Sequence, residues 1–212
     1  MKKINIAVVG LGQIGNYLLH ELNSKKKDIE LKTGKQISVV AISAKNINKR
    51  RKYKINKKLF FKNPLDIFRF KKIDILFESI GLSGGISKKV VEKAIKNKVH
   101  VITPNKALIA KHGDYLSKLA EKHKVNLEFE ASVAGGIPIL RTIKEGLATN
   151  KIFKVYGILN GTCNYILSQM EKSNNQFKEV LKKAQKLGYA EPGNPKLDLN
   201  GYDAFAKVRI LS

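Results

Sequence analysis

The sequence contains no tryptophan, five prolines and one cysteine, Cys163, among 212 residues. A single cysteine excludes a disulfide framework within the chain and suits a reducing compartment. Apolar runs stay well short of the ~18 residues that a membrane-spanning helix needs. The first segment, "MKKINIAVVGLGQIG", is broken by Asn5 and by glycines before it reaches the length of a signal peptide. We therefore expect a cytoplasmic protein with no membrane partner.

Acidic residues are scarce, because 17 Asp and Glu stand against 41 Lys and Arg and give a formal net charge of +24. Such a charge is typical of proteins that bind nucleic acids. The basic residues, however, are mostly lysines that recur with Asn and Ile, and aromatic residues are interleaved with them only at Tyr53 and Phe60-Phe61. We favour a compositionally biased surface over a nucleic-acid site. A salt titration of RNA or DNA affinity would distinguish the two.

Short apolar runs alternate with helical patterns through the first half of the chain. We predict strands at 4–9, 37–42, 73–77, 99–103 and 125–130, and helices at 14–22, 88–97 and 105–123. Strands that alternate with helices form crossover units and a parallel sheet. The predicted fold class is therefore α/β, with a Rossmann-like, doubly wound parallel sheet.

The pattern changes after the small residues near position 135. We predict helices at 138–147, 162–172 and 177–188, a strand at 151–159, and the start of an amphipathic helix within 197–212. We place the domain boundary after residue 133, so that 1–133 forms the first domain and 134–212 the second.

The segment "GLGQIG", residues 10 to 15, fits the pattern G-x-G-x-x-G directly after a predicted strand and directly before a predicted helix. In this context Gly10 allows the tight turn, Gly12 lets backbone amides approach a pyrophosphate, and Gly15 permits close packing of helix on strand. The pattern alone is weak evidence, but its position between strand and helix favours a dinucleotide site over a purely structural turn.

The tip of the second predicted strand indicates which dinucleotide binds. An acidic residue there normally bonds the ribose 2′-hydroxyl of NAD, but this chain has Ser43 and Ala44 at that place. Cations follow directly, at Lys45, Lys49, Arg50 and Arg51. A missing acid with cations nearby favours the 2′-phosphate of NADP over NAD, although a lysine-rich composition would produce the same pattern.

Four later segments also place small or polar residues at the ends of predicted elements. These are "FESIGLSGG" (77–85), "ITPNKALIA" (102–110), "EASVAGGIPIL" (130–140) and "GILNGTCNYIL" (157–167). In the last of them Cys163 has no histidine nearby to activate it, so we interpret it as a structural thiol.

Together with "AQKLGYAEPGNPKLDLNGYDAFAKVRIL" (184–211), these segments resemble homoserine dehydrogenase, and the resemblance extends over essentially the whole chain. It implies an enzyme that interconverts aspartate 4-semialdehyde and homoserine with NAD(P)H, in threonine, isoleucine and methionine biosynthesis. It also implies a homodimer, and an α+β substrate and dimerisation domain that is incomplete here, because family members continue beyond this length.

The resemblance assigns the chemistry to the last residues of the chain. Lys207 corresponds to the acid/base residue of the reaction. Glu191, Asp198 and Asp203 would form the acidic set that receives the substrate's ammonium group. Between Glu191 and Asp198 this chain is one residue longer than the usual spacing, an insertion that would move Glu191 relative to Asp198. On its own, the i,i+4 pair of Asp203 and Lys207 reads as an ordinary salt bridge.

The resemblance also assigns positions for the cofactor and for a cation. The residues expected at the NADP site are Gly10, Gly12, Gln13, Ile14, Gly15, Ser79, Lys106 and Gly188. A monovalent cation such as sodium would be bound, mostly through backbone oxygens, by Glu130, Val133, Gly135 and Ile137.

Because part of the catalytic domain is missing by comparison with the family, one alternative remains open. The chain could be a catalytically impaired remnant that binds NADP without turnover. An assay with aspartate semialdehyde and NADPH separates this from an active enzyme. An incomplete second domain would also expose apolar surface.

Overall fold

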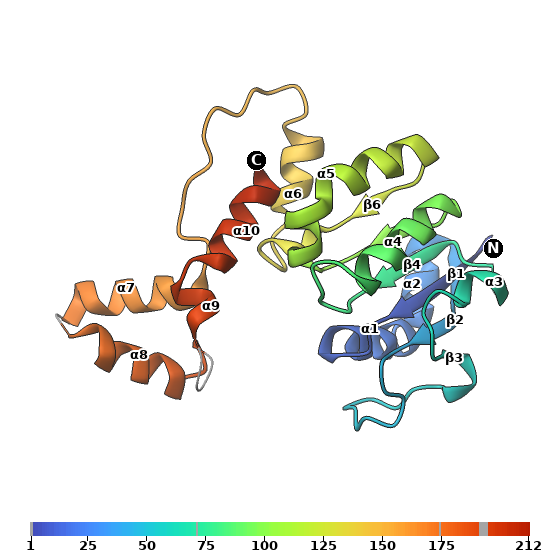
Figure 1. Ribbon diagram of the computed structural model, residues 1–212, viewed down its shortest axis with the longest axis horizontal. Helices are drawn as coiled ribbons and strands as arrows, with labels where there is room; N and C mark the ends of the chain where they lie inside the picture. The colour runs from blue at the N-terminus through green and yellow to red at the C-terminus, as the bar shows by residue number, and fades with distance from the viewer. Residues whose placement is uncertain (1, 71, 174, 191–194) are drawn as a thin grey trace. The chain divides into compact units, whose positions relative to one another are not determined.

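The computed structural model describes residues 2–70, 72–173, 175–190 and 195–212, and the chain divides into two compact units, Met1–Gly136 and Ile137–Ser212. Figure 1 shows strands and helices interleaved in the first unit, and helices joined by an extended segment in the second.

The first unit is built on a six-stranded sheet with the order β3-β2-β1-β4-β5-β6, in which every neighbouring pair is parallel. The strands are β1 (Lys2–Val9), β2 (Lys35–Ser43), β3 (Phe60–Phe61), β4 (Ile75–Glu78), β5 (His100–Ile102) and β6 (Leu127–Glu128). The order reverses between β1 and β4, as in a doubly wound sheet. This confirms the predicted fold class.

The strands are rich in apolar residues, as expected for a parallel sheet on which helices pack. Val8, Leu76 and Val101 are completely buried in β1, β4 and β5. A parallel strand covered on both faces carries a nearly continuous apolar run instead of an alternating one. The helices of this unit are α1 (Gln13–Ser24), α2 (Lys26–Thr33), α3 (Ile67–Phe70), α4 (Ile86–Lys96) and α5 (Lys106–His123). Short 3-10 turns lie at η1 (Lys57–Leu59) and η2 (Glu130–Ser132).

Helices are the only regular secondary structure in the described residues of the second unit. They are α6 (Ile139–Arg141), continued by the π-helical turn η3 (Thr142–Gly146), then α7 (Gly161–Ser173), α8 (Phe177–Lys186), α9 (Lys196–Leu199) and α10 (Tyr202–Leu211). Its small core brings Ile166 of α7 against Val180 and Ala184 of α8. The spacing of four residues between Val180 and Ala184 places both on one face of the helix.

The strand predicted at 151–159 is wrong. The segment has no ladder partner among the described residues, and a strand forms only when a neighbour accepts and donates its backbone hydrogen bonds. Its apolar side chains are exposed instead, with Phe153 at 85% and Tyr156 at 83%. The second unit therefore exposes apolar side chains along this segment.

A search of the described residues for a helix long and apolar enough to cross a membrane found none.

Candidate functional site

The glycine-rich turn after β1 is packed so tightly that two of its glycines have no room for a side chain. Gly10 has φ +92°, and a Cβ there would overlap the backbone of Ser79 at the end of β4. A Cβ on Gly15 would overlap the carbonyl oxygen of Gly10. The Ser79 hydroxyl donates to that same carbonyl at 2.8 Å. These contacts hold the first turn of α1 against the ends of β1 and β4.

Gly12 has a different environment from its two neighbours. It caps the amino terminus of α1, and a Cβ built on it would meet no atom within 4 Å. The free backbone amides of a helix amino terminus bind anionic groups such as a pyrophosphate. Gly12 therefore leaves open the space through which a pyrophosphate would approach these amides, and Gln13 and Ile14 are the next two exposed residues of the turn.

A cleft of about 1010 Å³ runs along the carboxyl ends of β1, β2 and β4. Gly10 and Gly12 line its middle, Ser43 and Ala44 its β2 side, and Ser79 its β4 side. In doubly wound sheets, dinucleotides bind in this position, where the strand order reverses. The cleft thus brings together the glycine turn, the tip of β2 and Ser79, as the sequence predicted for one site.

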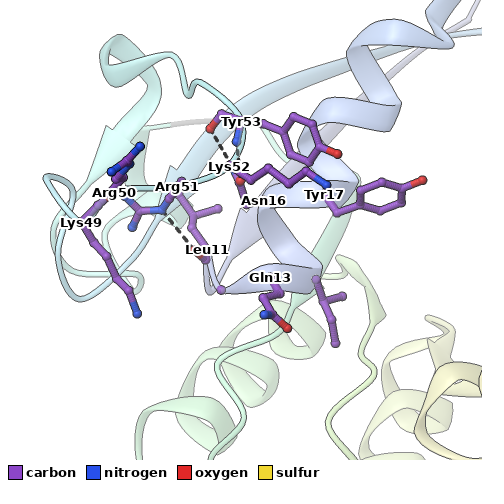
Figure 2. A pocket seen from close by; sticks show the side chains of 11 residues that line it. Leu11, Gln13, Asn16, Tyr17, Lys49, Arg50, Arg51, Lys52 and Tyr53 are labelled. Carbon is purple, nitrogen blue, oxygen red and sulfur yellow. Dashed lines mark hydrogen bonds between the residues drawn. The ribbon is translucent and has the colours of Figure 1, made fainter. Parts of the chain in front are cut away.

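In the basic loop after β2, one arginine side chain bonds the backbone, whereas several other cationic side chains make no such contact. Figure 2 shows Arg51 reaching back toward the glycine turn, where its Nε donates to the Leu11 carbonyl at 3.1 Å. The same guanidinium also donates to the carbonyls of Asn46, Ile47 and Lys49. Arg51 therefore ties the basic loop to the glycine turn through its guanidinium donors, and it also lines the cleft.

The neighbouring cations are free of such contacts. Lys45, Lys49 and Arg50 are exposed, and within the described chain no hydrogen bond or ion pair holds their side chains. Lys45 and Lys49 line the cleft. A second cavity of about 740 Å³ between this loop and α1 is also lined by Lys49 and by Arg50.

The loop is fixed to α1 by one amide side chain, which the sequence analysis missed. Asn16 is 3% exposed; its Nδ2 donates to the Tyr53 carbonyl and its Oδ1 accepts from the Tyr53 N–H, both at 2.9 Å (Figure 2). Tyr53 also stacks on His20. These contacts set where the free cations stand relative to the glycine turn.

A buried carboxylate lies at the end of β4, and it too was missed. Glu78 has no exposed surface and accepts hydrogen bonds from the Ile80 N–H at 2.8 Å and from the Thr103 hydroxyl at 2.7 Å. The Asn105 amide lies 3.4 Å from both of its oxygens and donates to the Leu82 carbonyl at 2.9 Å. Lys106, a predicted site residue, directly follows Asn105 as the first residue of α5.

In the second unit, the charged residues that the sequence analysis singled out on α10 contact each other. The Lys207 ammonium lies 2.7 Å from the Asp203 carboxylate and donates to the Leu159 carbonyl at 2.6 Å. Both side chains are largely buried, at 19% and 15% exposed. Asp203 and Lys207 thus form an i,i+4 pair that also contacts the segment before α7.

Asn160 connects this pair to the remaining aspartate. Its Nδ2 donates to Asp198 at 2.8 Å and to Asp203 at 3.0 Å, while its Oδ1 accepts from the Cys163 N–H at 2.9 Å. The side chain therefore caps α7 and orients both carboxylates. The Thr162 hydroxyl, 3.3 Å from Asp198, extends the same cluster. Asp198, Asp203 and Lys207 thus meet in one place, as predicted.

Cys163 lies at the edge of this cluster and is not activated. Burial and the charges of Asp198 and Asp203 raise the pKa of its thiol above the ordinary value. Its Sγ is directed at the Asp198 carbonyl, 3.5 Å away. Since the thiolate is the nucleophilic form, a raised pKa makes the thiol less reactive near neutral pH.

We therefore expect iodoacetamide at pH 8 to alkylate Cys163 several times more slowly in the folded chain than in the urea-unfolded chain, because less thiolate is present. The rate should climb only as the pH rises beyond the range of an ordinary thiol. Mass spectrometry follows the reaction cleanly, since the chain has one cysteine. The urea-unfolded chain is the control, and a folded chain that reacts as fast as the unfolded one would contradict the expectation.

Comparison with known families agrees with this geometry in both units. Residues 10–130 match the family described as "Homoserine dehydrogenase, NAD binding domain", and residues 138–212 match "Homoserine dehydrogenase". The chain belongs to the homoserine dehydrogenase family.

Individual relatives are similar along the whole of this chain. The homoserine dehydrogenase of Neisseria gonorrhoeae is 41% identical over 212 residues, and that of Bacillus subtilis 36% over 214. A crystal structure of a homoserine dehydrogenase from Thiobacillus denitrificans superposes with a TM-score of 0.84 at 39% identity. In each case the match covers 100% of this chain but 48% of the relative. The chain spans about half the length of these homoserine dehydrogenases.

The other predicted residues lie as follows. Glu191 is outside the described residues. Gly188, with φ +80°, follows α8 in the second unit. Of the predicted cation ligands, Glu130, Val133 and Gly135 belong to the first unit and Ile137 to the second.

The backbone turns sharply at the predicted cation ligands, with φ +49° at Ala134 and +88° at Gly136. Searching the described residues for three or more His, Cys, Asp or Glu side chains able to hold a metal found no group. That result does not bear on a site built from backbone oxygens.

Proposed function

We propose that this chain carries the dinucleotide site and the catalytic lysine of a homoserine dehydrogenase that interconverts aspartate 4-semialdehyde and homoserine and prefers NADP. The observation that carries the proposal is the Lys207 ammonium, held by Asp203 and the Leu159 carbonyl next to Asp198. An isolated surface salt bridge would have neither the second acceptor nor the adjoining carboxylate.

In this proposal NADPH, when bound, supplies the hydride that reduces the aldehyde carbon. Lys207 donates the proton that the carbonyl oxygen needs as it becomes a hydroxyl, and removes it in the reverse direction. Asp203 keeps the ammonium oriented, and the Leu159 carbonyl accepts a second of its protons, so the Nζ position is defined. A defined position matters because proton transfer requires hydrogen-bond distance.

Asp198 supplies the counter-charge that a small amino acid needs at its ammonium group, with Glu191 as a second acid. Asn160 Nδ2 donates to the Asp198 carboxylate at 2.8 Å, while the Thr162 hydroxyl, which donates to the Tyr189 carbonyl, lies 3.3 Å from it. Fixed charges of this kind orient a substrate for transfer at low entropic cost. Asn160 therefore acts as a positioning residue in the proposed site.

The cofactor positions in the proposal are Gly10, Gly12, Gln13, Ile14 and Gly15 at the pyrophosphate, with Ser79, Lys106 and Gly188 toward the nicotinamide. The open space at Gly12 and the free amides of α1 fit a dinucleotide. A monovalent cation such as sodium is proposed at the backbone oxygens of Glu130, Val133, Gly135 and Ile137. The left-handed turn at Ala134 and Gly136 suits such a site, since carbonyl oxygens are ligands for hard cations.

The preference for NADP is supported by the free cations at the tip of β2. We expect Lys49→Glu to weaken NADPH binding about tenfold and to leave NADH binding within about twofold, because the new carboxylate would repel the 2′-phosphate, which NADH lacks. Fluorescence titration measures both. Lys118→Glu, the same charge reversal at an exposed position of α5, is the matched control. Equal losses for the two dinucleotides would contradict the 2′-phosphate assignment.

The wider biological setting belongs to the proposal as well. The reaction places the chain in threonine, isoleucine and methionine biosynthesis, in the cytoplasm and as a homodimer. The absence of a disulfide framework supports the compartment, and the exposed Phe153 and Tyr156 leave apolar surface for a partner.

The deciding experiment is oxidation of NADPH by the folded chain with aspartate 4-semialdehyde, followed at 340 nm. Turnover above that of a heat-unfolded sample supports the proposal. NADPH binding without turnover supports the alternative of a chain that binds the cofactor but is catalytically impaired. A chain that binds no NADPH would contradict both, and a steep salt dependence of RNA affinity would then favour nucleic-acid binding.

A further inference from the structure

Glu78 is the most deeply buried charged side chain that the proposed chemistry does not use. It is 0% exposed, and within the described part of the chain no cationic side chain pairs with it. Burying a carboxylate is costly unless hydrogen bonds replace its water. A leucine would fill similar space but would leave the Ile80 N–H and the Thr103 hydroxyl without this acceptor, so the carboxylate is tied to the groups that donate to it.

The partners of Glu78 belong to two different turns. Its Oε1 accepts from the Ile80 N–H in the turn after β4, and its Oε2 accepts from the Thr103 hydroxyl in the turn after β5. Asn105, whose amide also faces the carboxylate, donates to the Leu82 carbonyl and so joins the second turn to the first again. One carboxylate therefore fixes the turn 79–82 relative to the turn 103–106.

These two turns lie on one side of the dinucleotide cleft. Ile80 and Leu82 line it directly, on the side of β4 and away from the β2 tip. In a doubly wound sheet the tip of the second strand contacts the adenosine ribose, which leaves the side beyond the strand reversal for the nicotinamide. The turn after β5 also starts α5, where the Asn105 side chain accepts from the Leu108 N–H and Lys106 follows.

We propose that Glu78 is a positioning residue for the nicotinamide half of the cofactor. It pre-orders the turns 79–82 and 103–106 so that neither has to be ordered when the dinucleotide binds. This inference rests on the proposed function, since it assumes that NADP occupies the cleft. It assigns to Glu78 no contact with the cofactor itself.

The test compares two ligands that share only the adenosine end. NADPH spans the cleft, whereas adenosine 2′,5′-bisphosphate lacks the nicotinamide half. In Glu78→Gln an NH2 group replaces one carboxylate oxygen. A donor group then faces the hydroxyl or amide donor from which that oxygen accepted a hydrogen bond. We expect NADPH affinity to fall about tenfold, equivalent to about 1.4 kcal/mol, while adenosine 2′,5′-bisphosphate binds within about twofold of the unchanged chain. Calorimetric titration of the full chain measures both.

Controls separate positioning from general damage. Glu128→Gln makes the same change at an exposed residue of β6 and should alter neither affinity. Thr103→Val removes the donor hydroxyl and should repeat the selective loss, whereas Thr103→Ser keeps the hydroxyl and should bind NADPH like the unchanged chain. If Glu78→Gln does not fold, the two Thr103 variants test the inference instead, through the ratio of the NADPH affinity to the adenosine 2′,5′-bisphosphate affinity.

Two results would overturn the inference. One is an equal loss of both ligands in folded Glu78→Gln and Thr103→Val, which would mean general damage. The other is NADPH binding that neither variant changes. Failure of the unchanged chain to bind NADPH is a different result, because it removes the proposed function and the inference together before any variant is compared.

Discussion

Replacing Lys207 by methionine is expected to lower kcat by about a thousandfold relative to the unchanged chain. General acid and base catalysis commonly contributes between about 100-fold and 10,000-fold. Methionine keeps an apolar chain in place of the lysine stem but has no proton to give. NADPH affinity should stay within about twofold, because Lys207 is not among the proposed cofactor positions, which apart from Gly188 lie in the first unit. Steady-state assays and a separate NADPH titration measure the two quantities.

A second variant distinguishes proton transfer from charge. Lys207→Arg keeps the positive charge beside Asp203, but a guanidinium does not deprotonate near neutral pH. We expect it to lose activity almost as fully as Lys207→Met. If Lys207→Arg retained activity, the charge and not the proton would be what the reaction needs. Lys186→Met, at an exposed position in the last turn of α8, is the matched control and should remain active.

The architecture of the first unit could be predicted because its signal is local. Each buried strand is an apolar run, and each glycine of the turn after β1 has a steric or ligand-related reason to be glycine. Local sequence could not show whether a strand forms at 151–159. Its alternation of apolar and polar residues is typical of a strand, but pairing depends on residues far away in the sequence, and no described segment supplies them.

The resemblance named the charged residues that the structure brings together in the second unit, but Asn160, Asn16 and Glu78 were missed. Asp198, Asp203 and Lys207 were identified by resemblance, whereas Asn160, which links two of them, was not. A signal for Asn160 did exist, because an asparagine before "GTC" at the start of a predicted helix is a typical amino-terminal cap. Asn16 and Glu78 gave no such signal. Their partners are up to 37 positions away, at a distance that only the folded chain closes.

Substitutions in the glycine turn should separate folding from binding. Gly15→Ala places a methyl group into the Gly10 carbonyl oxygen, which belongs to the backbone and cannot turn aside. Overpacking of this kind costs about 1–3 kcal/mol of the free energy of unfolding. We expect urea denaturation to show that loss without added ligand, and NADPH binding to weaken as the turn shifts.

Gly12→Ala, three positions earlier, is the matched variant, and we expect it to have the opposite outcome. Its methyl group would meet no protein atom within 4 Å, and φ of −72° suits alanine, so the free energy of unfolding should change by less than about 0.5 kcal/mol. The methyl group would instead occupy the approach of the pyrophosphate, and NADPH should bind about tenfold or more weakly. If Gly12→Ala bound NADPH normally, the pyrophosphate would not lie on the amino terminus of α1. If Gly15→Ala were as stable as the unchanged chain, the backbone there would be able to shift by more than the close packing against Gly10 and Ser79 indicates.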